Sequence, residues 1–270
     1  MNKLITFNEL PYWYRDNDLI TNGYRKPNNC TSQCVYSIFN LHNETFNIWS
    51  HIIGIIQFMM LAFFTYFDDL FLLHKFILYG YCLAVIICFI FSVIHHTMIP
   101  HSEHVHKSCL SLDYLGIIFI LFATTSILIY KCFYDREYNT HKIVYIMIMG
   151  VILYLLSTLI YTTNFISPEK KHIRIILFSL ACLFTLIPVI HSGYIHSFNK
   201  KFIIIVANVM ISIILISIGL YIYINRFPES KYKNDLFNYI GNSHNIWHVM
   251  SIITLTVHFY VIKYVLKYLE

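Results

Sequence analysis

The sequence predicts an all-α membrane protein, a seven-transmembrane helix bundle whose N-terminus is cytoplasmic and whose C-terminus lies on the exterior or lumenal side. Of its residues, 57% are hydrophobic and only 12% are charged, whereas soluble domains contain about 25% charged residues. The hydrophobic residues form long continuous stretches and do not alternate with polar residues, which excludes a membrane-spanning strand barrel. The low content of Gly and Pro excludes a collagen-like or disordered chain.

Residues 1–44 are mixed and polar, and we expect them to form a cytoplasmic segment ahead of the first span. No hydrophobic stretch follows the basic start, which excludes a cleavable signal peptide. Residues 32–41 have the pattern of a short amphipathic helix, so we predict an interfacial helix in this segment. The aromatic run at residues 12–14 is also typical of a membrane interface. An ordinary solvated arm is the alternative for that run.

After Glu44 the chain contains seven stretches without Asp, Glu, Lys or Arg, and a helix needs about 17–25 apolar residues to cross a membrane. The third stretch is the shortest, but its helix can extend back over Asp113 if that carboxyl group faces the interior of the bundle. The seven stretches are Thr45–Phe67, Phe76–Ser102, Tyr114–Tyr130, Ile143–Pro168, Ile175–Asn199, Phe202–Asn225 and Leu236–Ile262.

Seven spans place the two termini on opposite sides of the membrane. More of the 19 Lys and Arg residues fall on the N-terminal side than on the other side, and this bias predicts a cytoplasmic N-terminus. This orientation is the reverse of that of a G-protein-coupled receptor. The formal net charge of +5 is spread over short loops, so we interpret it as a signal of topology and expect no nucleic-acid partner.

His244 and His248 stand four residues apart at the start of the seventh span, so they lie on one helix face and can bind one metal ion together. The order of the spans brings further polar residues to the same side of the membrane, at the end of the second span and the start of the third. These residues are Ser92, His95, His96 and Asp113. We therefore predict a metal site in one leaflet, to which either His95 or His96 contributes the third imidazole.

Three imidazole ligands with an open fourth position are typical of catalytic Zn²⁺, and Mg²⁺ or Ca²⁺ would need more oxygen ligands. Asp113 is the candidate that orients a water molecule on the metal and takes its proton. Ser92 can place its hydroxyl near that water or near a substrate carbonyl. The alternative role for Asp113 is a helix cap at the start of the third span. His51 is interpreted as a packed or interfacial residue, and His258 lies too far along its helix to join the site.

Several motifs occur in order along the chain, and together they are specific. They are Asn22-Gly23-Tyr24-Arg25, Ser37-Ile38-Phe39, the run from His42 to His51, Ser92-x3-His96 with His101-Ser102-Glu103, Leu112-Asp113-Tyr114-Leu115-Gly116-Ile117, Arg226-Phe227-Pro228-Glu229 and the run from Ser243 to Val249. With these motifs the chain resembles, from about Leu10 to Tyr260, the progestin and adiponectin receptor family, which is related to haemolysin-III-like membrane proteins.

The resemblance implies a set of zinc ligands, namely His96, His244 and His248. The family's Ser-x3-His spacing, here from Ser92, selects His96 over His95. The resemblance also implies that Asp113 holds the water on the metal and that residues 45–270 form a seven-transmembrane zinc-binding domain. Members of this family are described as hormone receptors or as zinc-dependent lipid amidases that act on ceramide-like substrates.

We therefore expect an intramembrane zinc enzyme that hydrolyses a ceramide-like lipid amide and releases a fatty acid, with membrane lipids as its partners. The alternative is a receptor or adaptor in signalling or Golgi/ER trafficking, with a structural zinc and a signalling protein as partner. A channel or transporter agrees less well with the sequence, because only Pro188 suggests a broken span. We expect the protein in the plasma membrane or in the Golgi or ER membrane. An open fourth zinc position would favour the enzyme, and a fourth protein ligand would favour structural zinc.

Overall fold

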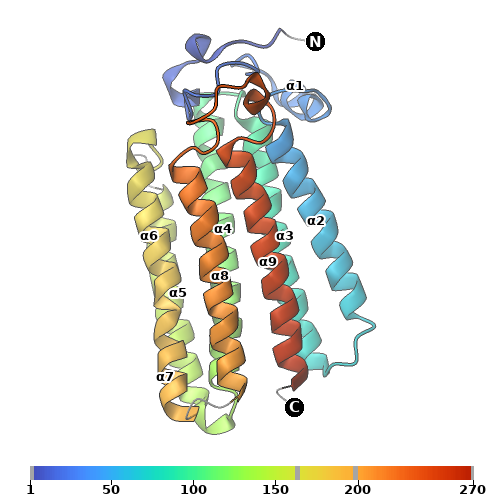
Figure 1. Cartoon of the computed structure of the whole chain (residues 1–270), viewed down its shortest axis with the longest axis vertical. Coiled ribbons are helices and arrows are strands. Elements are labelled where there is room, and N and C mark those ends of the chain that lie inside the picture. The colour runs from blue at the N-terminus through green and yellow to red at the C-terminus, as the bar shows by residue number, and fades with distance from the viewer. Residues whose placement is uncertain (1–2, 162–164, 197–199, 269–270) are drawn as a thin grey trace. The chain divides into compact units, whose positions relative to one another are not determined.

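The computed structural model describes residues 3–161, 165–196 and 200–268, and Figure 1 shows the order of its helices. Seven helical segments are long and apolar enough to cross a membrane. Within the described ranges, one isolated bridge between Ile5 and Tyr24 is the only strand-like pairing. The predicted all-α fold with seven candidate spans is confirmed, and the orientation of the termini stays a prediction.

The spans are formed by the long helices, and short helices precede or connect them. The long helices are α2 (Thr45–Thr65), α3 (Leu72–Met98), α4 (Glu103–Cys132), α5 (Asn139–Tyr161), α6 (Lys171–Phe184) with α7 (Leu186–His196), α8 (Lys200–Ile224) and α9 (Ser243–Tyr268). The short elements are η1 (Phe7–Glu9), η2 (Tyr12–Tyr14), α1 (Thr31–Tyr36), η3 (Ser37–Phe39), η4 (Arg136–Tyr138), η5 (Pro168–Lys170) and η6 (Asp235–Asn238).

Three spans show how the local sequence sets the helix ends. The third span extends back to Glu103 and includes Asp113, as expected. The fifth is divided because the ring of Pro188 clashes with a helical carbonyl four residues earlier, and α6 ends at that residue, Phe184. The seventh begins at Ser243 and not at Leu236, since the intervening residues form η6 and a turn that contains Gly241 with a positive φ.

The chain divides into two compact units, and the first comprises Met1–Gln57, Phe89–Asp113 and Leu215–Thr254. Within it, the N-terminal segment has a small hydrophobic core of its own, formed by Leu10, Tyr14, Ile20, Tyr24 and Ile99. Gly23 adopts a φ of 87°, and a Cβ there would lie 3.0 Å from the ring of Tyr239. Both the backbone conformation and the space at this turn therefore require glycine.

The predicted amphipathic helix is present as α1 followed by η3. Its hydrophobic side chains are exposed, with Tyr36 at 72% and Phe39 at 75%. An exposed apolar surface of this kind suits the boundary between lipid and water. Its position at the membrane interface stays a prediction.

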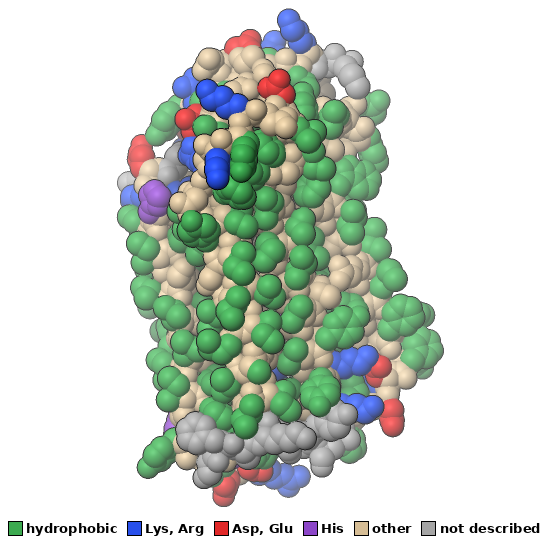
Figure 2. Space-filling model, in the orientation of Figure 1, with side chains coloured by type: hydrophobic (Ala, Val, Ile, Leu, Met, Phe, Trp, Pro, Cys, Tyr) green, Lys and Arg blue, Asp and Glu red, His purple; other side chains and the backbone are tan. Residues whose placement is uncertain are grey.

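The second unit comprises Phe58–Cys88, Tyr114–Ile214 and Leu255–Glu270. One hydrophobic cluster in it packs α4, α7 and α8 together through Leu128, Ile129, Cys132, Phe133, Val189, Phe202, Ile205 and Val209. Figure 2 shows hydrophobic side chains spread along the helices on the face in view, with charged side chains mainly near the two ends. Exposed apolar side chains are favourable where the surrounding medium is lipid.

Candidate metal centre

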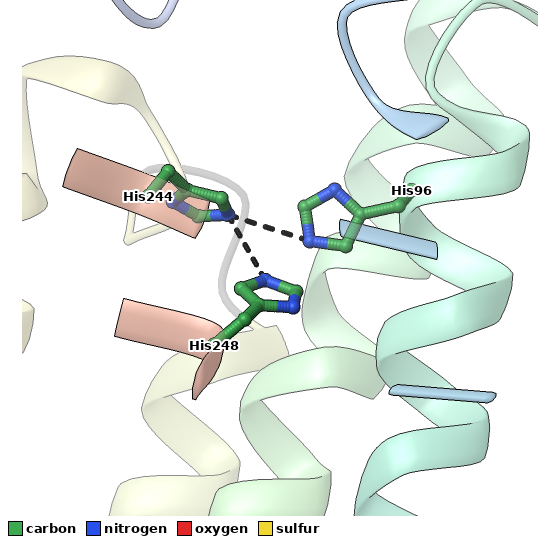
Figure 3. A group of neighbouring side chains, drawn as sticks. All are labelled: His96, His244 and His248. Carbon is green, nitrogen blue, oxygen red and sulfur yellow. Dashed lines mark hydrogen bonds between the residues drawn. The ribbon is translucent and has the colours of Figure 1, made fainter. Parts of the chain in front are cut away.

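Three imidazole rings meet within the first unit (Figure 3). His96 lies in the last turn of α3, while His244 and His248 lie in the first two turns of α9. Nε2 of His244 lies 3.4 Å from Nε2 of His96 and 3.3 Å from Nε2 of His248. One ligand atom from each of the three residues lies within 4.8 Å of the other two. The predicted grouping of these residues is therefore present, and metal binding by them stays a prediction.

The spacing of the three nitrogens fits a zinc ion. In a tetrahedral site, Zn–N bonds of about 2.0–2.1 Å place the ligand nitrogens about 3.3–3.4 Å apart. Hydrogen bonds among the imidazoles explain this arrangement less well. A proton on Nε2 of His244 can be donated to only one of the two neighbouring nitrogens at a time, whereas a cation attracts all three lone pairs.

A carboxylate fixes the orientation of His96. Nδ1 of His96 lies 2.8 Å from Oε2 of Glu44, and because a carboxylate only accepts, Nδ1 is the donor. The lone pair of this neutral imidazole is therefore on Nε2, the atom that faces the other two rings. Carboxylate–histidine pairs of this kind orient the histidine ligands of zinc sites and raise their basicity.

Glu44 is itself held by two amides. Asn43 donates to its Oε1 and Asn47 to its Oε2, each at 2.7 Å. Burial acts to raise the pKa of Glu44, but the hydrogen bonds from His96 and from the amide of Asn47 act against it, and the pKa lies below its usual value. Glu44 therefore serves as a charged acceptor beside the metal centre.

His248 is oriented in the same way by a hydroxyl group. Ser50 donates from Oγ to the carbonyl of Asn47 at 3.0 Å, so its oxygen accepts from Nδ1 of His248 at 3.2 Å. Nε2 of His248 is thereby left with its lone pair. Asn47 also accepts a hydrogen bond from Nδ2 of Asn245 at 2.7 Å, which joins α2 to the first turn of α9.

The N-terminal segment supports the end of α3. The buried Arg25 donates from Nη2 to the carbonyl of His96 at 2.6 Å and from Nη1 to the carbonyl of Thr97 at 3.0 Å. The last carbonyls of a helix lack partners inside the helix, and a cation there is favoured by the helix dipole. From the sequence, Arg25 is the last residue of the motif Asn22-Gly23-Tyr24-Arg25 without a role in the site, and the structure shows that it supports a predicted metal ligand.

The start of α9 is fixed by a second carboxylate. Glu229 accepts from the backbone N–H of Ser243 at 2.8 Å and from its hydroxyl at 2.5 Å, and from Nδ2 of Asn17 at 3.1 Å. Asn242 caps the helix through the N–H of Asn245 at 3.0 Å. These contacts set the position of the turn that carries His244.

Ser92 and Asp113 lie beside this centre. Ser92 is buried, and Asp113 interacts electrostatically with Ser92 and with His96. Asp113 is not a member of the ligand group itself. The alternative that it caps the third span is wrong, because α4 begins well before it at Glu103. A catalytic role for both residues stays a prediction.

Two neighbouring histidines, His95 and His51, lie outside the group of candidate ligands. His95 packs against the rings of His96 and His106, with centroids 5.1 and 5.4 Å away, and does not join the ligand group. His51 is a packed residue, as expected. Its ring stacks on that of His248 at a centroid distance of 3.9 Å.

Glu44, Asn47, Ser50 and Arg25 are the residues of this centre that sequence reasoning did not assign to it. Their signal is the motif from His42 to His51, which contains the first three at spacings of three residues. This spacing places side chains on one face of a helix. The partner of that face could not be read from the sequence.

Comparison with known proteins places the chain in a family. The haemolysin-III-related family profile matches residues 39–259. The chain is 27% identical to the adiponectin receptor protein of Drosophila melanogaster over 98% of its own length and 60% of the length of that protein. It is 30% identical to progestin and adipoQ receptor-like protein 1 of Caenorhabditis elegans, over 96% of this chain and 60% of the relative.

The progestin and adipoQ receptor family member 3 of Mus musculus is 27% identical, over 98% of this chain and 87% of the mouse protein. The resemblance inferred from the motifs is thus confirmed over nearly the whole chain. The protein belongs to the haemolysin-III-related family, and its relatives include adiponectin receptors and progestin and adipoQ receptors.

Proposed function

We propose that the chain is an intramembrane zinc enzyme that hydrolyses a ceramide-like lipid amide. The observation that supports this function is the convergence of three imidazole Nε2 atoms at 3.3 and 3.4 Å. In the part of the chain that the structure describes, no fourth His, Cys, Asp or Glu joins the group. A site with three protein ligands leaves a position for water and substrate, which is typical of catalytic zinc and not of structural zinc.

Neutral imidazoles favour Zn²⁺, because Mg²⁺ and Ca²⁺ prefer several oxygen ligands. His96, His244 and His248 would hold the ion. When bound, zinc supplies a Lewis acid that polarises a carbonyl group and lowers the pKa of a water molecule to about 7. Glu44 and Ser50 keep two of the ligands in the neutral form with the proton on Nδ1.

Asp113 would act as the general base and then as the general acid. Its carboxylate takes a proton from the attacking water, and gives it to the amide nitrogen as the C–N bond breaks. The products are a fatty acid and a free amine. Ser92 would hold the Asp113 carboxyl group in place or donate its hydroxyl proton in a hydrogen bond to the substrate carbonyl.

The proposal includes the route of the substrate, the membrane in which the protein resides and the roles of two segments of the chain. The substrate is a membrane lipid that enters laterally between helices, and the protein resides in the plasma membrane or the Golgi or ER membrane. Residues 1–44 form a cytoplasmic segment with an interfacial helix, and residues 45–270 form the zinc-binding domain. The exposed aromatic side chains of Tyr36 and Phe39 support the interfacial position.

A second candidate function is a receptor or adaptor in which zinc is structural and a signalling protein is the partner. Its support comes from the names of the relatives, which are receptors. The hydrogen bond of Arg25 to the carbonyl of His96 also supports it, because it joins the N-terminal segment to the metal centre. In this function zinc would brace α2, α3 and α9 within the first unit.

Zinc content and ceramide hydrolysis, measured on the same purified samples in lipid nanodiscs, test the proposal. We expect His248→Ala to lose zinc and hydrolysis together. Asp113→Asn should keep zinc and lose about 10²–10⁴-fold in turnover, the usual contribution of general acid–base catalysis. The control is His104→Ala, which removes an exposed imidazole and should change neither quantity. Turnover of Asp113→Asn at the wild-type rate would remove Asp113 from the mechanism, and zinc binding without any hydrolysis would favour the receptor.

A further inference from the structure

The N-terminal segment and the turn before α9 form a polar cavity that the metal centre does not use. Its volume is about 370 Å³, which is typical of a site for a small ligand. All of its lining residues belong to the first unit. Residues 4–6 and 22–23 form one wall, and Asp235, Asn238 and Tyr239 form the other.

Hydrogen bonds hold both walls in place. Ile5 and Tyr24 exchange backbone hydrogen bonds at 2.9 and 3.2 Å, which joins the two parts of the first wall. Oδ1 of Asn238 accepts from the backbone N–H of Thr21 at 2.8 Å and from that of Asn22 at 3.2 Å, which joins the second wall to the first. The cavity is therefore formed before any ligand binds.

The ring of Tyr239 lies against the backbone of the first wall. A Cβ on Gly23 would lie only 3.0 Å from this ring, so the glycine leaves the space that the ring occupies. The hydroxyl of Tyr239 has no hydrogen-bond partner among the described residues. A phenol both donates and accepts, so this hydroxyl is available to a ligand in the cavity.

Asp235 gives the cavity a negative charge. It is exposed, and it takes part in none of the ion pairs within the described part of the chain. No Lys or Arg is among the lining residues. One carboxylate is too few for Ca²⁺, which takes six to eight oxygen ligands, and Mg²⁺ is held in proteins chiefly together with phosphate groups. The charge therefore points to an organic cation.

Asn238 adds a hydrogen-bond donor beside this charge. Its Oδ1 is committed to two backbone N–H groups, and its Nδ2 makes no hydrogen bond in the structure as described. The amide nitrogen donates and does not accept. A carboxylate, a hydroxyl and an amide donor in one cavity suit a ligand that carries a cation next to an oxygen atom.

We propose that this cavity binds a primary ammonium group with a neighbouring oxygen, as in ethanolamine. Asp235 and Tyr239 accept hydrogen bonds from the ammonium group, and Nδ2 of Asn238 donates to the oxygen. A free amine and the head group of an aminophospholipid carry this same chemistry, and the experiment distinguishes the two sources. The site does not depend on the proposed zinc chemistry.

Isothermal titration calorimetry of the purified full chain in uncharged detergent tests the site. The ammonium probes are ethanolamine and dihexanoyl phosphatidylethanolamine. Ethylene glycol and dihexanoyl phosphatidylglycerol are the matched probes that lack the ammonium group. We expect saturable binding of an ammonium probe and none of its matched probe. Binding of ethanolamine identifies a free amine as the ligand, and binding of the phosphatidylethanolamine alone identifies a lipid head group.

Asp235→Asn removes the charge and keeps the size of the side chain. It should weaken binding about 10–100-fold, the usual contribution of a hydrogen bond to a charged group. Tyr239→Phe removes only the hydroxyl and should weaken binding about 2–10-fold, as expected for a hydrogen bond of a neutral group. The matched control is Asp69→Asn, which changes an exposed carboxylate of the second unit and should bind as the wild type does.

An unchanged affinity of Asp235→Asn, equal binding of the probes with and without the ammonium group, or no binding of either ammonium probe to the wild type overturns the proposal. Zinc content is measured on the same samples and should equal that of the wild type in all three variants. Failure of this site is therefore distinguishable from failure of the metal centre.

Discussion

At the scale of single residues, hydrogen bonds decide which nitrogen of an imidazole faces a metal. Glu44 accepts a hydrogen bond from Nδ1 of His96, and Ser50 accepts one from Nδ1 of His248. Both Nε2 atoms are left with lone pairs that face the third ring. The centre is therefore prepared for a cation by groups that do not touch the cation themselves.

Glu44→Gln is expected to weaken zinc binding about 10–100-fold, the usual effect of removing a carboxylate behind a histidine ligand. The amide still accepts a hydrogen bond from Nδ1 of His96 but lacks the charge that raises the basicity of the ring. Competition with a chelator of known affinity measures the change. Glu9→Gln, which alters an exposed carboxylate bonded to Thr6, serves as the control. Equal zinc affinities for Glu44→Gln and the wild type would contradict this role.

His42 gives a prediction about pH. Burial and the nearby charge of Arg25 lower the pKa of His42 to about 3, from a usual value of 6.5. Its Nε2 donates to the carbonyl of Ser37 at 3.1 Å and its Nδ1 accepts from the N–H of Glu44 at 3.1 Å. These contacts require the neutral ring, because a protonated Nδ1 could not accept the hydrogen bond from the N–H of Glu44.

The unfolded chain therefore binds more protons than the folded chain between pH 6.5 and pH 3. This difference lowers stability as the pH falls through that window, with a slope of up to about 1.4 kcal/mol per pH unit from this group. His42→Gln removes the titrating group and should flatten the slope. Unfolding midpoints of both proteins, measured from pH 7 to pH 4 in chelator to exclude zinc release, give the difference. Parallel curves would show that His42 does not titrate in this way.

At the scale of helices, the predicted metal ligands depend on helix ends that other segments hold in place. Arg25 caps the carbonyls at the end of α3, and Glu229 with Asn242 caps the start of α9. His96 and His244 both lie within one turn of these ends. Helix ends fray without caps, so the caps keep the ligands in place.

Helix contact in the second unit depends on Gly116 of α4. A Cβ at this position would lie 2.8 Å from Cα of Cys88 in α3, so the helices would have to separate. We expect Gly116→Ala to destabilise the protein by about 1–3 kcal/mol, a typical cost of overpacking. Gly150→Ala in α5 is the matched control, because nothing lies within 4 Å of its added methyl group. It should be neutral or stabilise by up to about 1 kcal/mol through helix propensity.

The changes in stability are measured as denaturation midpoints of the two alanine variants, each compared with the wild type in the same detergent. The two substitutions make the same chemical change in a helix interior, so their difference reports the contact with Cys88 alone. A Gly116→Ala protein that is as stable as Gly150→Ala would show that α3 and α4 adjust without cost.

At the scale of the whole molecule, the proposed metal centre joins segments that are far apart in the chain. Its ligands and their partners come from all three segments of the first unit. The unfolded chain holds no such site, so a metal that binds only the folded state stabilises it by mass action.

Removal of zinc with a chelator should therefore lower the unfolding midpoint of the wild-type protein. The expected loss is about 4 kcal/mol when the free zinc concentration was about 1,000-fold above Kd. His248→Ala should unfold at the same temperature with and without the chelator. Return of the wild-type midpoint on addition of zinc, but not of Mg²⁺, would identify the ion. A midpoint that does not change on chelation would show that metal binding and folding are not coupled.

The membrane helices are the part of this fold that composition and local pattern determine. A helix crosses lipid only if its side chains are apolar over the full thickness, so the count of spans follows from uncharged stretches alone. The break near Pro188 is likewise local, because the proline ring clashes with the carbonyl four residues earlier. The extension of α4 past Asp113 is also local, because it follows from the length that a spanning helix needs. The seventh uncharged stretch begins before α9, because the residues after Leu236 are apolar but form η6 and a turn with Gly241. His244 lies at the start of the helix, as predicted.

By itself the sequence determined the seven spans, the span ends at which three histidines meet, and, through the motifs, the family. Only the tertiary structure decided that Glu44 and Ser50 orient two of those rings and that Arg25 supports the C-terminal end of α3. The physical reason is that hydrogen bonds and ion pairs depend on distances of a few tenths of an ångström between segments remote in the chain. Hydrophobic burial depends mainly on the amount of apolar surface, which can be read residue by residue.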